Sequence, residues 1–467
     1  PDLTRNDPTK LGPSGGPITK DNTAVEYYCT IFAATESPLQ KDLLWAGSDD
    51  GLVHVSQDGG EHWENVTPPK IPEWTMINSI EPDPFGKGGL YLAATRYKLG
   101  DFKPYLYKTK DYGASWTKID QGIDQEHFTR VIRADPKRPG LLYAGTESGM
   151  YISFDDGISW KPFQLNLPTV PITDLALKND NLIAATQGRS FWLVDDLTPL
   201  HQLNETVAAS SFYLYKPMDS YRMDPRGSFE PKPKNAGTNH PGGVMIHYYL
   251  KEEADSTDTL TLEILDASGE LIRSFSNQQQ EDQPAKELAT KAGMNRRIWD
   301  MRYQEAEKFE GLILWGSGTL GPKAAPGNYR ARLSLNGETL ETDFDIIKDP
   351  RSESSQQELQ AQFEFLKEIR DKLSETHLAI KSMRDVKQQI DVLQQKIKGE
   401  EQYQEITVTG DSLKSKIDRI EQQLYQTKNQ SAQDPLNFPI RLNNKLADLS
   451  QVGTGNFKPT DLSLIHI

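Results

Sequence analysis

Residues 27–203 alternate between short apolar runs and turn-forming residues. One kind of run recurs four times, at residues 44–48, 91–95, 142–146 and 182–186, with alanines at positions 46, 93, 144 and 184. A strand-rich repeat of about 40–50 residues is typical of β-propeller blades, and small residues suit the crowded inner part of such sheets. We therefore predict a partial β-propeller of about four blades over residues 1–203.

A second pattern, Ser/Thr-x-Asp-x-Gly-x-x-Trp (the Asp box), follows three of these runs, at residues 56–63, 109–116 and 153–160. In such a turn the Asp side chain bonds the backbone, the Gly supplies a positive φ, and the Trp packs on the hairpin. The fourth repeat ends without the pattern, so we predict that it is a terminal blade. We assign structural roles to the motif residues, which are Asp58, Gly60, Trp63, Asp111, Gly113, Trp116, Asp155, Gly157 and Trp160.

The chain changes character after residue 203. Residues 204–243 are predicted to be a connector, of which 225–243 are rich in Pro, Gly, Lys and Asn and are typical of an extended linker. Residues 244–350 alternate again, and this spacing over about a hundred residues predicts an immunoglobulin-like β-sandwich. The predicted strands lie at 244–250, 259–265, 270–275, 298–303, 328–335 and around 344–346, with a tight turn at Asn336-Gly337 before the last strand.

Residues 351–461 are predicted to form an antiparallel helical bundle. Apolar residues recur at heptad spacing along 359–397 and again along 413–424, and a shorter helix follows at 442–449. A bundle within the chain would cover these apolar stripes, and the alternative is a helix that recruits a protein partner. Residues 462–467 show no turn or cap pattern, and we interpret them as a tail that is not native to the protein.

The composition of the chain argues against several classes of partner and cofactor. The net charge of −15 argues against nucleic acid or an anionic membrane as the main partner. No apolar run approaches the roughly 18 residues that a transmembrane helix needs. Cys29 is the only cysteine, which excludes an intrachain disulfide and a cysteine metal cluster. The histidines lack metal-ligand spacing and no phosphate loop or nucleophile elbow occurs, so we expect neither a metal nor a cofactor.

The candidate binding residues come from one edge of the predicted blades. The Asp boxes join the third and fourth strands, so the loops between the second and third strands lie at the opposite edge. Carboxylates, arginines and aromatic rings at the mouth of a propeller suit a sugar or a peptide. Each of these residues can instead be a solvated loop residue, and Arg189 can stack on Trp192 as a structural pair. The candidates are Asp49, Asp50, Trp74, Arg96, Tyr97, Glu147 and Arg189.

The Asp boxes, with the stretches at 45–51 and 186–199, resemble large bacterial proteins known as sortilin-like or BNR-repeat glycosyl hydrolases. The resemblance continues through 293–303 and 442–446, and it implies an exported, extracytoplasmic protein of which this chain is a C-terminal fragment. A more distant resemblance is to xyloglucanases with tandem propellers, in which the loop after Leu-Tyr-Ala-Arg-Thr carries a catalytic carboxylate. That resemblance implies a catalytic role for Asp49, although Gly47 replaces the arginine of the motif.

Three functions are compatible with these patterns. The first is a binding protein that takes a glycan or a peptide on the side of the propeller that carries these candidate residues, without catalysis in this chain. The second is a glycoside hydrolase that needs blades N-terminal to this chain. The third is a sortilin-like sorting or assembly scaffold that uses the propeller and the helical tail. We favour binding, because the sequence shows no combination of acid, base and positioning groups.

Overall fold

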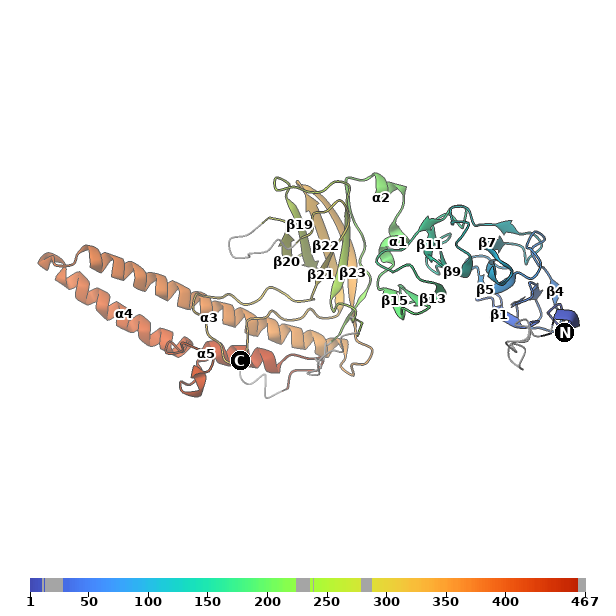
Figure 1. Cartoon of the computed structure of the whole chain (residues 1–467). Coiled ribbons are helices and arrows are strands. Elements are labelled where there is room, and N and C mark those ends of the chain that lie inside the picture. Colours follow the sequence, from blue (N-terminus) through green and yellow to red (C-terminus); the bar gives the residue numbers. More distant parts are fainter. Residues whose placement is uncertain (11, 13–27, 224–235, 238, 279–287, 461–467) are drawn as a thin grey trace. The chain divides into compact units, whose positions relative to one another are not determined.

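The computed structural model describes residues 1–10, 12, 28–223, 236–237, 239–278 and 288–460. The chain folds into two compact units, Pro1–His201 and Gln202–Ile467 (Figure 1). Within the described ranges, none of the helices combines the length and the apolarity that crossing a bilayer requires.

Unit 1 contains four consecutive antiparallel sheets, here called blades 1 to 4, in which each strand pairs with the next along the chain. Blade 1 comprises β1 (Ile31–Glu36), β2 (Leu44–Ser48), β3 (Val53–Ser56) and β4 (Glu64–Asn65). Blade 2 comprises β5 (Met76–Pro82), β6 (Leu90–Arg96), β7 (Asp101–Thr109) and β8 (Thr117–Lys118). Blade 3 comprises β9 (Thr129–Ala134), β10 (Leu142–Thr146), β11 (Gly149–Ser153) and β12 (Lys161–Pro162). Blade 4 comprises β13 (Ile172–Lys178), β14 (Asn181–Thr186) and β15 (Phe191–Val194).

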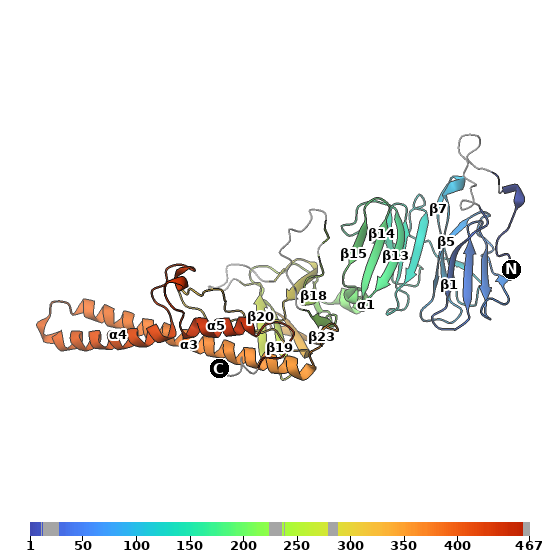
Figure 2. The ribbon, with the colours of Figure 1, turned by 90° about the horizontal axis from the view of Figure 1, so that it is seen from below.

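Neighbouring blades pack face to face, and their innermost strands β1, β5, β9 and β13 contact one another in turn (Figure 2). Three buried apolar clusters fill the three interfaces. The four repeated runs coincide with the second strands of the blades, where small residues are required. A Cβ atom on Gly145 would lie 2.7 Å from the side chain of Ile172 in the next blade, so glycine is needed there. The succession of sheets is propeller-like, as predicted.

The three Asp-box turns make the same hydrogen bonds in blades 1, 2 and 3. In each turn, the aspartate accepts from the hydroxyl two residues earlier at 2.8 Å and from the backbone N–H four residues later at 2.9 Å. The backbone N–H of the motif glycine donates to the same hydroxyl, and its φ lies between 81° and 97°. Because such φ values favour glycine, geometry explains the pattern of Asp and Gly in all three turns.

The motif tryptophans bond differently from the prediction that each packs on its own hairpin. Trp116 Nε1 donates to the carbonyl oxygen of Val66 at 2.7 Å, and Trp160 Nε1 donates to that of Ile119 at 2.6 Å. Both acceptors directly follow the last strand of the preceding blade, so these two rings join consecutive blades. In blade 1, Trp63 has no preceding blade among the described residues, and it donates within its own turn, to Gly60, at 3.0 Å.

Two short helices, α1 (Thr198–Gln202) and α2 (Glu205–Ala209), follow blade 4. Unit 2 then contains two sheets that share one apolar core. The three-stranded sheet has the order β16 (Phe212–Leu214), β18 (Val244–Leu250) and β21 (Gly293–Trp299). The five-stranded sheet has the order β17 (Ser220–Arg222), β23 (Glu338–Lys348), β22 (Gly327–Leu335), β19 (Leu260–Asp266) and β20 (Leu271–Ser276). Only β17 and β23 are parallel among these pairs in the described chain.

Two predictions for this region were wrong. The range 204–243 is more than a connector, because β16 and β17 lie within it and Phe212 and Leu214 are buried in the shared core. The strand predicted at 298–303 lies at 293–299 instead, and the positive φ of 63° at Met301 is incompatible with a continuing strand. Most of the linker predicted at 225–243 lies outside the described residues.

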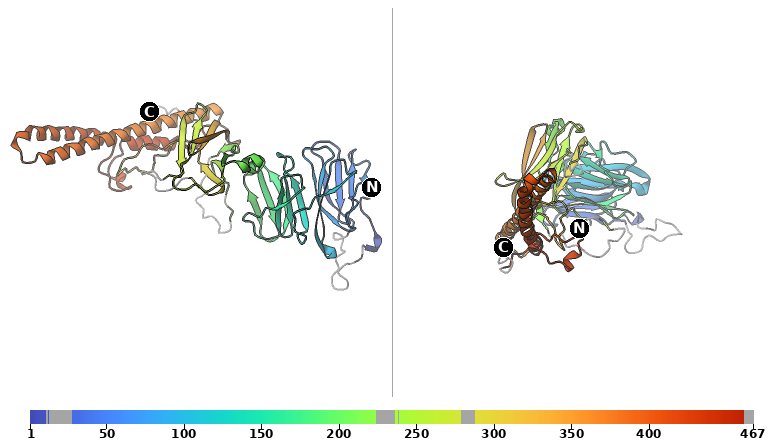
Figure 3. Two further views of the ribbon diagram at one scale, coloured as in Figure 1. Left: turned by 90° about the horizontal axis from the view of Figure 1, so that it is seen from above. Right: turned by 90° about the vertical axis from the view of Figure 1, so that its left-hand side faces the viewer.

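Three helices complete unit 2. The 41-residue helix α3 (Gln356–Lys396) begins with a capping box, α4 (Gln404–Leu424) returns along its second half, and α5 (Leu442–Val452) packs on its first half (Figures 1 and 3). The buried Arg222 of β17 joins the sheets to the helices, since its guanidinium donates to Gln362 Oε1 at 2.8 Å. The tail predicted at 462–467 lies outside the described residues. Short 3₁₀ turns occur at η1 (Pro8–Lys10), η2 (Tyr97–Leu99), η3 (Glu401–Tyr403) and η4 (Asp434–Leu436).

Candidate functional site

The antiparallel strand order gives every blade two distinct edges. The Asp boxes, at residues 56–63, 109–116 and 153–160, lie at one edge, which we call the Asp-box edge. The loops between second and third strands, and the connections from one blade to the next, lie at the opposite edge, which we call the loop edge. The strand bounds place all of the predicted binding residues at the loop edge.

Asp49 and Asp50 lie in the loop between β2 and β3, and both are buried. Asp49 Oδ1 accepts from the backbone N–H of Thr30 at 2.9 Å, and Asp50 Oδ2 accepts from that of Arg5 at 2.6 Å. Burial raises the pKa of Asp49, and the neighbouring Asp50 charge raises it further. Both carboxylates therefore anchor the preceding chain segments to blade 1, and this geometry gives Asp49 the bonds of a structural residue.

Trp74 begins an aromatic and cationic cluster beside these carboxylates. Its ring meets the ring of Tyr28 edge to face, with centroids 5.9 Å apart. The Arg5 guanidinium lies 5.8 Å from the Trp74 centroid, and Lys98 Nζ lies 5.5 Å from the Tyr28 centroid. Residues of the N-terminal segment, of the connection between blades 1 and 2, and of η2 thus meet at one place. Cations over ring faces are favourable contacts, and they fix the orientation of the rings.

The second part of the cluster joins blades 2 and 3. Tyr97 stacks on Phe128 with centroids 5.0 Å apart and an interplanar angle of 14°. The Arg130 guanidinium lies within 5.8 Å of both ring centroids and ion-pairs with Glu147 at 2.6 Å. Phe102 lies 6.1 Å from Phe128 and is exposed. Because Tyr97 and Lys98 are adjacent in η2, the two parts are continuous.

The remaining two candidates do not belong to the aromatic cluster. Arg96 Nε donates to the carbonyl oxygen of Glu73 at 3.0 Å, and this bond holds the connection between blades 1 and 2. Arg189 is exposed on blade 4. Its expected partner Trp192 contacts it through the backbone, because Trp192 Nε1 donates to the Arg189 carbonyl oxygen at 2.9 Å. The cation–π alternative for this pair was therefore wrong.

A partly exposed ionic cluster on the innermost strands was not predicted. Arg133 of β9 donates to Ser79 Oγ in blade 2 at 2.8 Å, and to the carbonyl oxygen of Leu175 and to Asp174 Oδ1 in blade 4 at 2.8 and 2.7 Å. Glu81 Oε2 lies 3.7 Å from the same guanidinium, and burial raises the pKa of Glu81 to about 7. One arginine thus couples three blades at their inner ends.

An exposed acidic group in the first Asp box has a structural explanation. The carboxylates of Asp58 and Glu61 and the imidazole of His62 lie close enough together to share a cation. However, His62 Nδ1 lies 2.7 Å from Asp58 Oδ2, in the place where Ser115 and Ser159 donate to the aspartates of the other two boxes. The histidine therefore replaces a serine of the repeated turn.

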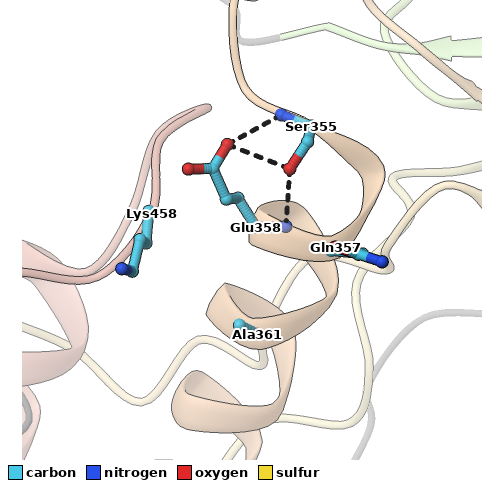
Figure 4. A pocket seen from close by; sticks show the side chains of 5 residues that line it. All are labelled: Ser355, Gln357, Glu358, Ala361 and Lys458. Atoms are coloured by element: carbon cyan, nitrogen blue, oxygen red, sulfur yellow. Dashed lines mark hydrogen bonds between the residues drawn. The ribbon is translucent and has the colours of Figure 1, made fainter.

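A shallow cavity of about 480 Å³ in unit 2 adjoins the beginning of α3. Figure 4 shows that Ser355 and Glu358 bond each other there: Glu358 Oε2 accepts from the Ser355 backbone N–H at 2.8 Å, and Ser355 Oγ accepts from the Glu358 N–H at 3.2 Å. Lys458 lies across the cavity from them. The helix terminus is thus capped by its own residues, and the Glu358 charge disfavours an anionic ligand.

No protein-family model matches the chain, and no curated protein matches it. Among solved structures, the chain is similar to YCF48 bound to D1 peptide, with 20% identity over 36% of this chain and 52% of that chain and a TM-score of 0.29. It is also similar to the GH74 xyloglucanase from Xanthomonas campestris, with 13% identity over 66% of this chain and 51% of that chain and a TM-score of 0.29. The chain spans about half the length of each of these proteins. At these identities and TM-scores, the likenesses assign no residue and no activity to this chain.

Proposed function

We propose that unit 1 is a binding module that takes a glycan or a peptide on its loop edge, without catalysis in this chain. The observation that carries the proposal is the loop-edge cluster, a continuous group of rings and cations across blades 1, 2 and 3. Its members are Tyr28, Trp74, Tyr97, Lys98, Phe102, Phe128 and Arg130. Phe128 is buried and supports the ring of Tyr97, whereas the other rings of the cluster are exposed or partly exposed. Fixed, exposed aromatic rings offer large contact area at low entropic cost, and they pack on sugar faces or apolar side chains.

The carboxylates of the loop edge support binding over hydrolysis. Glycosidases commonly use two carboxyl groups about 5–10 Å apart across the scissile bond. Here Asp49 and Asp50 accept hydrogen bonds from backbone N–H groups, and Glu147 is ion-paired with Arg130. These bonds fix the three carboxyl groups to neighbouring parts of the chain, whereas a glycosidase needs an acid and a nucleophile that are free to meet the substrate.

The finer assignments are inferences from the sequence patterns and the family resemblance. We infer an extracytoplasmic protein in which the sheets of unit 2 form an immunoglobulin-like sandwich and the helices form a supporting bundle. The sortilin-like role as an assembly scaffold differs from simple binding in that it requires a second contact through the helices.

A matched pair of substitutions tests the binding site. Phe102 and Phe85 belong to the same blade and are each 46% exposed, but Phe85 lies in the turn between β5 and β6 at the Asp-box edge. The whole chain is screened against oligosaccharides, including xyloglucan fragments, and against a peptide library. We expect Phe102→Ala and Tyr97→Ala to weaken the best interaction by roughly tenfold each, the effect of losing one ring contact. Phe85→Ala is expected to bind as the parent does.

Two results would overturn the proposal. One is equal loss of affinity in the Phe102→Ala and Phe85→Ala variants, which would show that the loop edge is not the site. The other is hydrolysis of an oligosaccharide by the parent chain that disappears in Asp49→Asn, which would establish the glycosidase alternative.

A further inference from the structure

The second half of the helical hairpin carries a regular apolar row on each helix. We call residues 383–424 the α3–α4 arm. Its apolar residues are spaced by three, four or seven positions, which is typical of helices that pack along their length against other helices. The rows consist of Met383, Val386, Ile390 and Leu393 on α3 with Ile397 at its C-cap, and of Ile406, Leu413, Ile417, Ile420 and Leu424 on α4.

Within the arm, the two helices contact each other through ion pairs and through part of the rows, since Ile417 is buried and Ile390 lies against Gly410 of α4. Lys414 Nζ ion-pairs with Asp391 at 2.8 Å, and Arg384 Nε ion-pairs with Glu421 at 2.7 Å. Gln394 Nε2 donates to the backbone of α4 at 2.9 Å. The ion pairs define which residues of each helix face the other.

The exposed members of the rows are rotated away from this contact by the same amount on both helices. On α3, Val386 and Leu393 directly precede Lys387 and Gln394, which face α4. A step of one residue is about 100° around a helix. On α4, the row residues at 413 and 420 likewise precede two residues that face α3, at 414 and 421. Because the helices are antiparallel, equal rotations place both rows on one side of the arm.

Beyond the base of the arm, where Met383 and Leu424 pack against a buried apolar cluster of unit 2, this side is uncovered by the described part of the chain. Five residues of the rows are 41–55% exposed, namely Val386, Leu393, Ile406, Leu413 and Ile420. In the first half of α3, by contrast, Leu373 is 2% exposed because α5 packs over it. An apolar surface of this regularity on a helix pair is completed by further helices, as in a four-helix bundle.

We propose that the uncovered side packs against the same side of a second copy of this chain, with the two arms antiparallel. The charges along the rim of α3 identify the occupant. Asp385 and Lys396 flank the α3 row, and neither forms an ion pair within the described ranges. In an antiparallel dimer, a two-fold axis that passes between residues 390 and 391 would relate the two α3 helices. This axis would bring Asp385 of each copy opposite Lys396 of the other copy.

The rim of α4 has the same property. Glu405 and Arg419 flank its row and have no ion-pair partner among the described residues. A two-fold axis at residue 412 would bring Glu405 of each copy opposite Arg419 of the other copy. The two centres nearly coincide, because Asp391 ion-pairs with Lys414, about 3 Å along the helix from residue 412. On each helix an acidic residue lies near one end of the rim and a basic residue near the other. Such a rim is complementary to an antiparallel second copy of itself, whereas a uniformly acidic or basic partner would be repelled along one half of the rim. The inference does not depend on the loop edge.

Sedimentation equilibrium of the whole chain tests the proposal. We expect a concentration-dependent dimer that Leu393→Glu weakens by roughly tenfold or more, since a charge would enter the centre of the interface. Leu378→Glu is the matched control, because Leu378 lies on the same helix outside the arm and is 46% exposed against 48% for Leu393. Circular dichroism of each variant verifies that the helices are intact.

A charge exchange supplies an independent test. Asp385→Lys places like charges opposite each other and is expected to weaken the dimer, and the double variant Asp385→Lys with Lys396→Asp is expected to restore it. A chain that stays monomeric at every concentration would overturn the proposal, including the case in which an unrelated protein covers the arm. Equal effects of Leu393→Glu and Leu378→Glu would also overturn it.

Discussion

The two edges of the blades in unit 1 differ in how far their residues and contacts repeat from one blade to the next. At the Asp-box edge, three blades repeat the same hydrogen bonds with distances that agree within about 0.2 Å. At the loop edge, the residues differ from blade to blade: paired aspartates in blade 1, a 3₁₀ turn with aromatic rings in blade 2, and an Arg–Glu pair in blade 3. The repeated hydrogen bonds indicate that the Asp-box turns have the same structural role in each blade, whereas the variable residues of the loop edge are available to bind a ligand.

The Asp-box edge also shows how blades are joined. The tryptophans of blades 2 and 3 bond the preceding blade, whereas Trp63 bonds its own turn. The same residue in the same motif therefore contributes to the contact between blades only where a neighbouring carbonyl is present.

The largest expected effect sharpens this difference between the tryptophans. Trp160 is buried between blades 2 and 3, so Trp160→Ala removes a large side chain and the hydrogen bond to Ile119. We expect a loss of about 3–5 kcal/mol in the free energy of unfolding of unit 1. Trp63→Ala is the control and is expected to cost about 1 kcal/mol. Urea unfolding followed by fluorescence of the remaining tryptophans measures both, and equal losses would contradict the assigned roles.

The second expected effect concerns the inner strands, between the two edges. The pKa of Glu81 is raised to about 7 from an ordinary value of 4.5, so the unfolded chain releases this proton first. The contribution of Glu81 to the free energy of unfolding is therefore greatest below about pH 4.5. This contribution, about 3 kcal/mol in total, is lost as the pH rises to about 7. Glu81→Gln is expected to remove this part of the pH dependence. The prediction fails if the stability curves of the parent and the variant are parallel between pH 4.5 and 7.

The smallest expected effect tests the repetition itself. His62→Ser gives the first Asp box the residue that the other two boxes have at this position, and the hydroxyl can donate to Asp58 as Ser115 donates to Asp111. We expect the free energy of unfolding to change by less than about 0.5 kcal/mol. A larger loss, measured by the same urea titration, would show that the histidine has a role of its own.

The sequence alone predicted the features that depend on local chemistry. The Asp boxes and the four alanine-containing strands were recognised because their turns and tight packing require particular residues. The contact of Trp116 with Val66 was not predictable, because the acceptor is a backbone carbonyl that leaves no residue signature. The short strands β16 and β17 were missed for a related reason: three residues are too few to show a period, and their pairing partners lie far away in the chain.

The candidate site was predicted in part. Trp74 and Tyr97 were named because aromatic residues in loops are conspicuous. Their neighbours Arg5 and Phe128 were missed, since Arg5 is about seventy residues from Trp74 and Phe128 reads as the start of a strand. Chain folding, rather than sequence proximity, brings these groups together.

Hydrogen–deuterium exchange of the whole chain, with and without the tightest-binding oligosaccharide or peptide of the screen, tests the central claim most directly. Bound ligand slows exchange of the backbone amides that it covers or rigidifies. The account predicts protection of residues 96–102 and 126–130 at the loop edge, with no change in the three Asp boxes. Protection of the Asp boxes, with residues 96–102 and 126–130 unchanged, would contradict it.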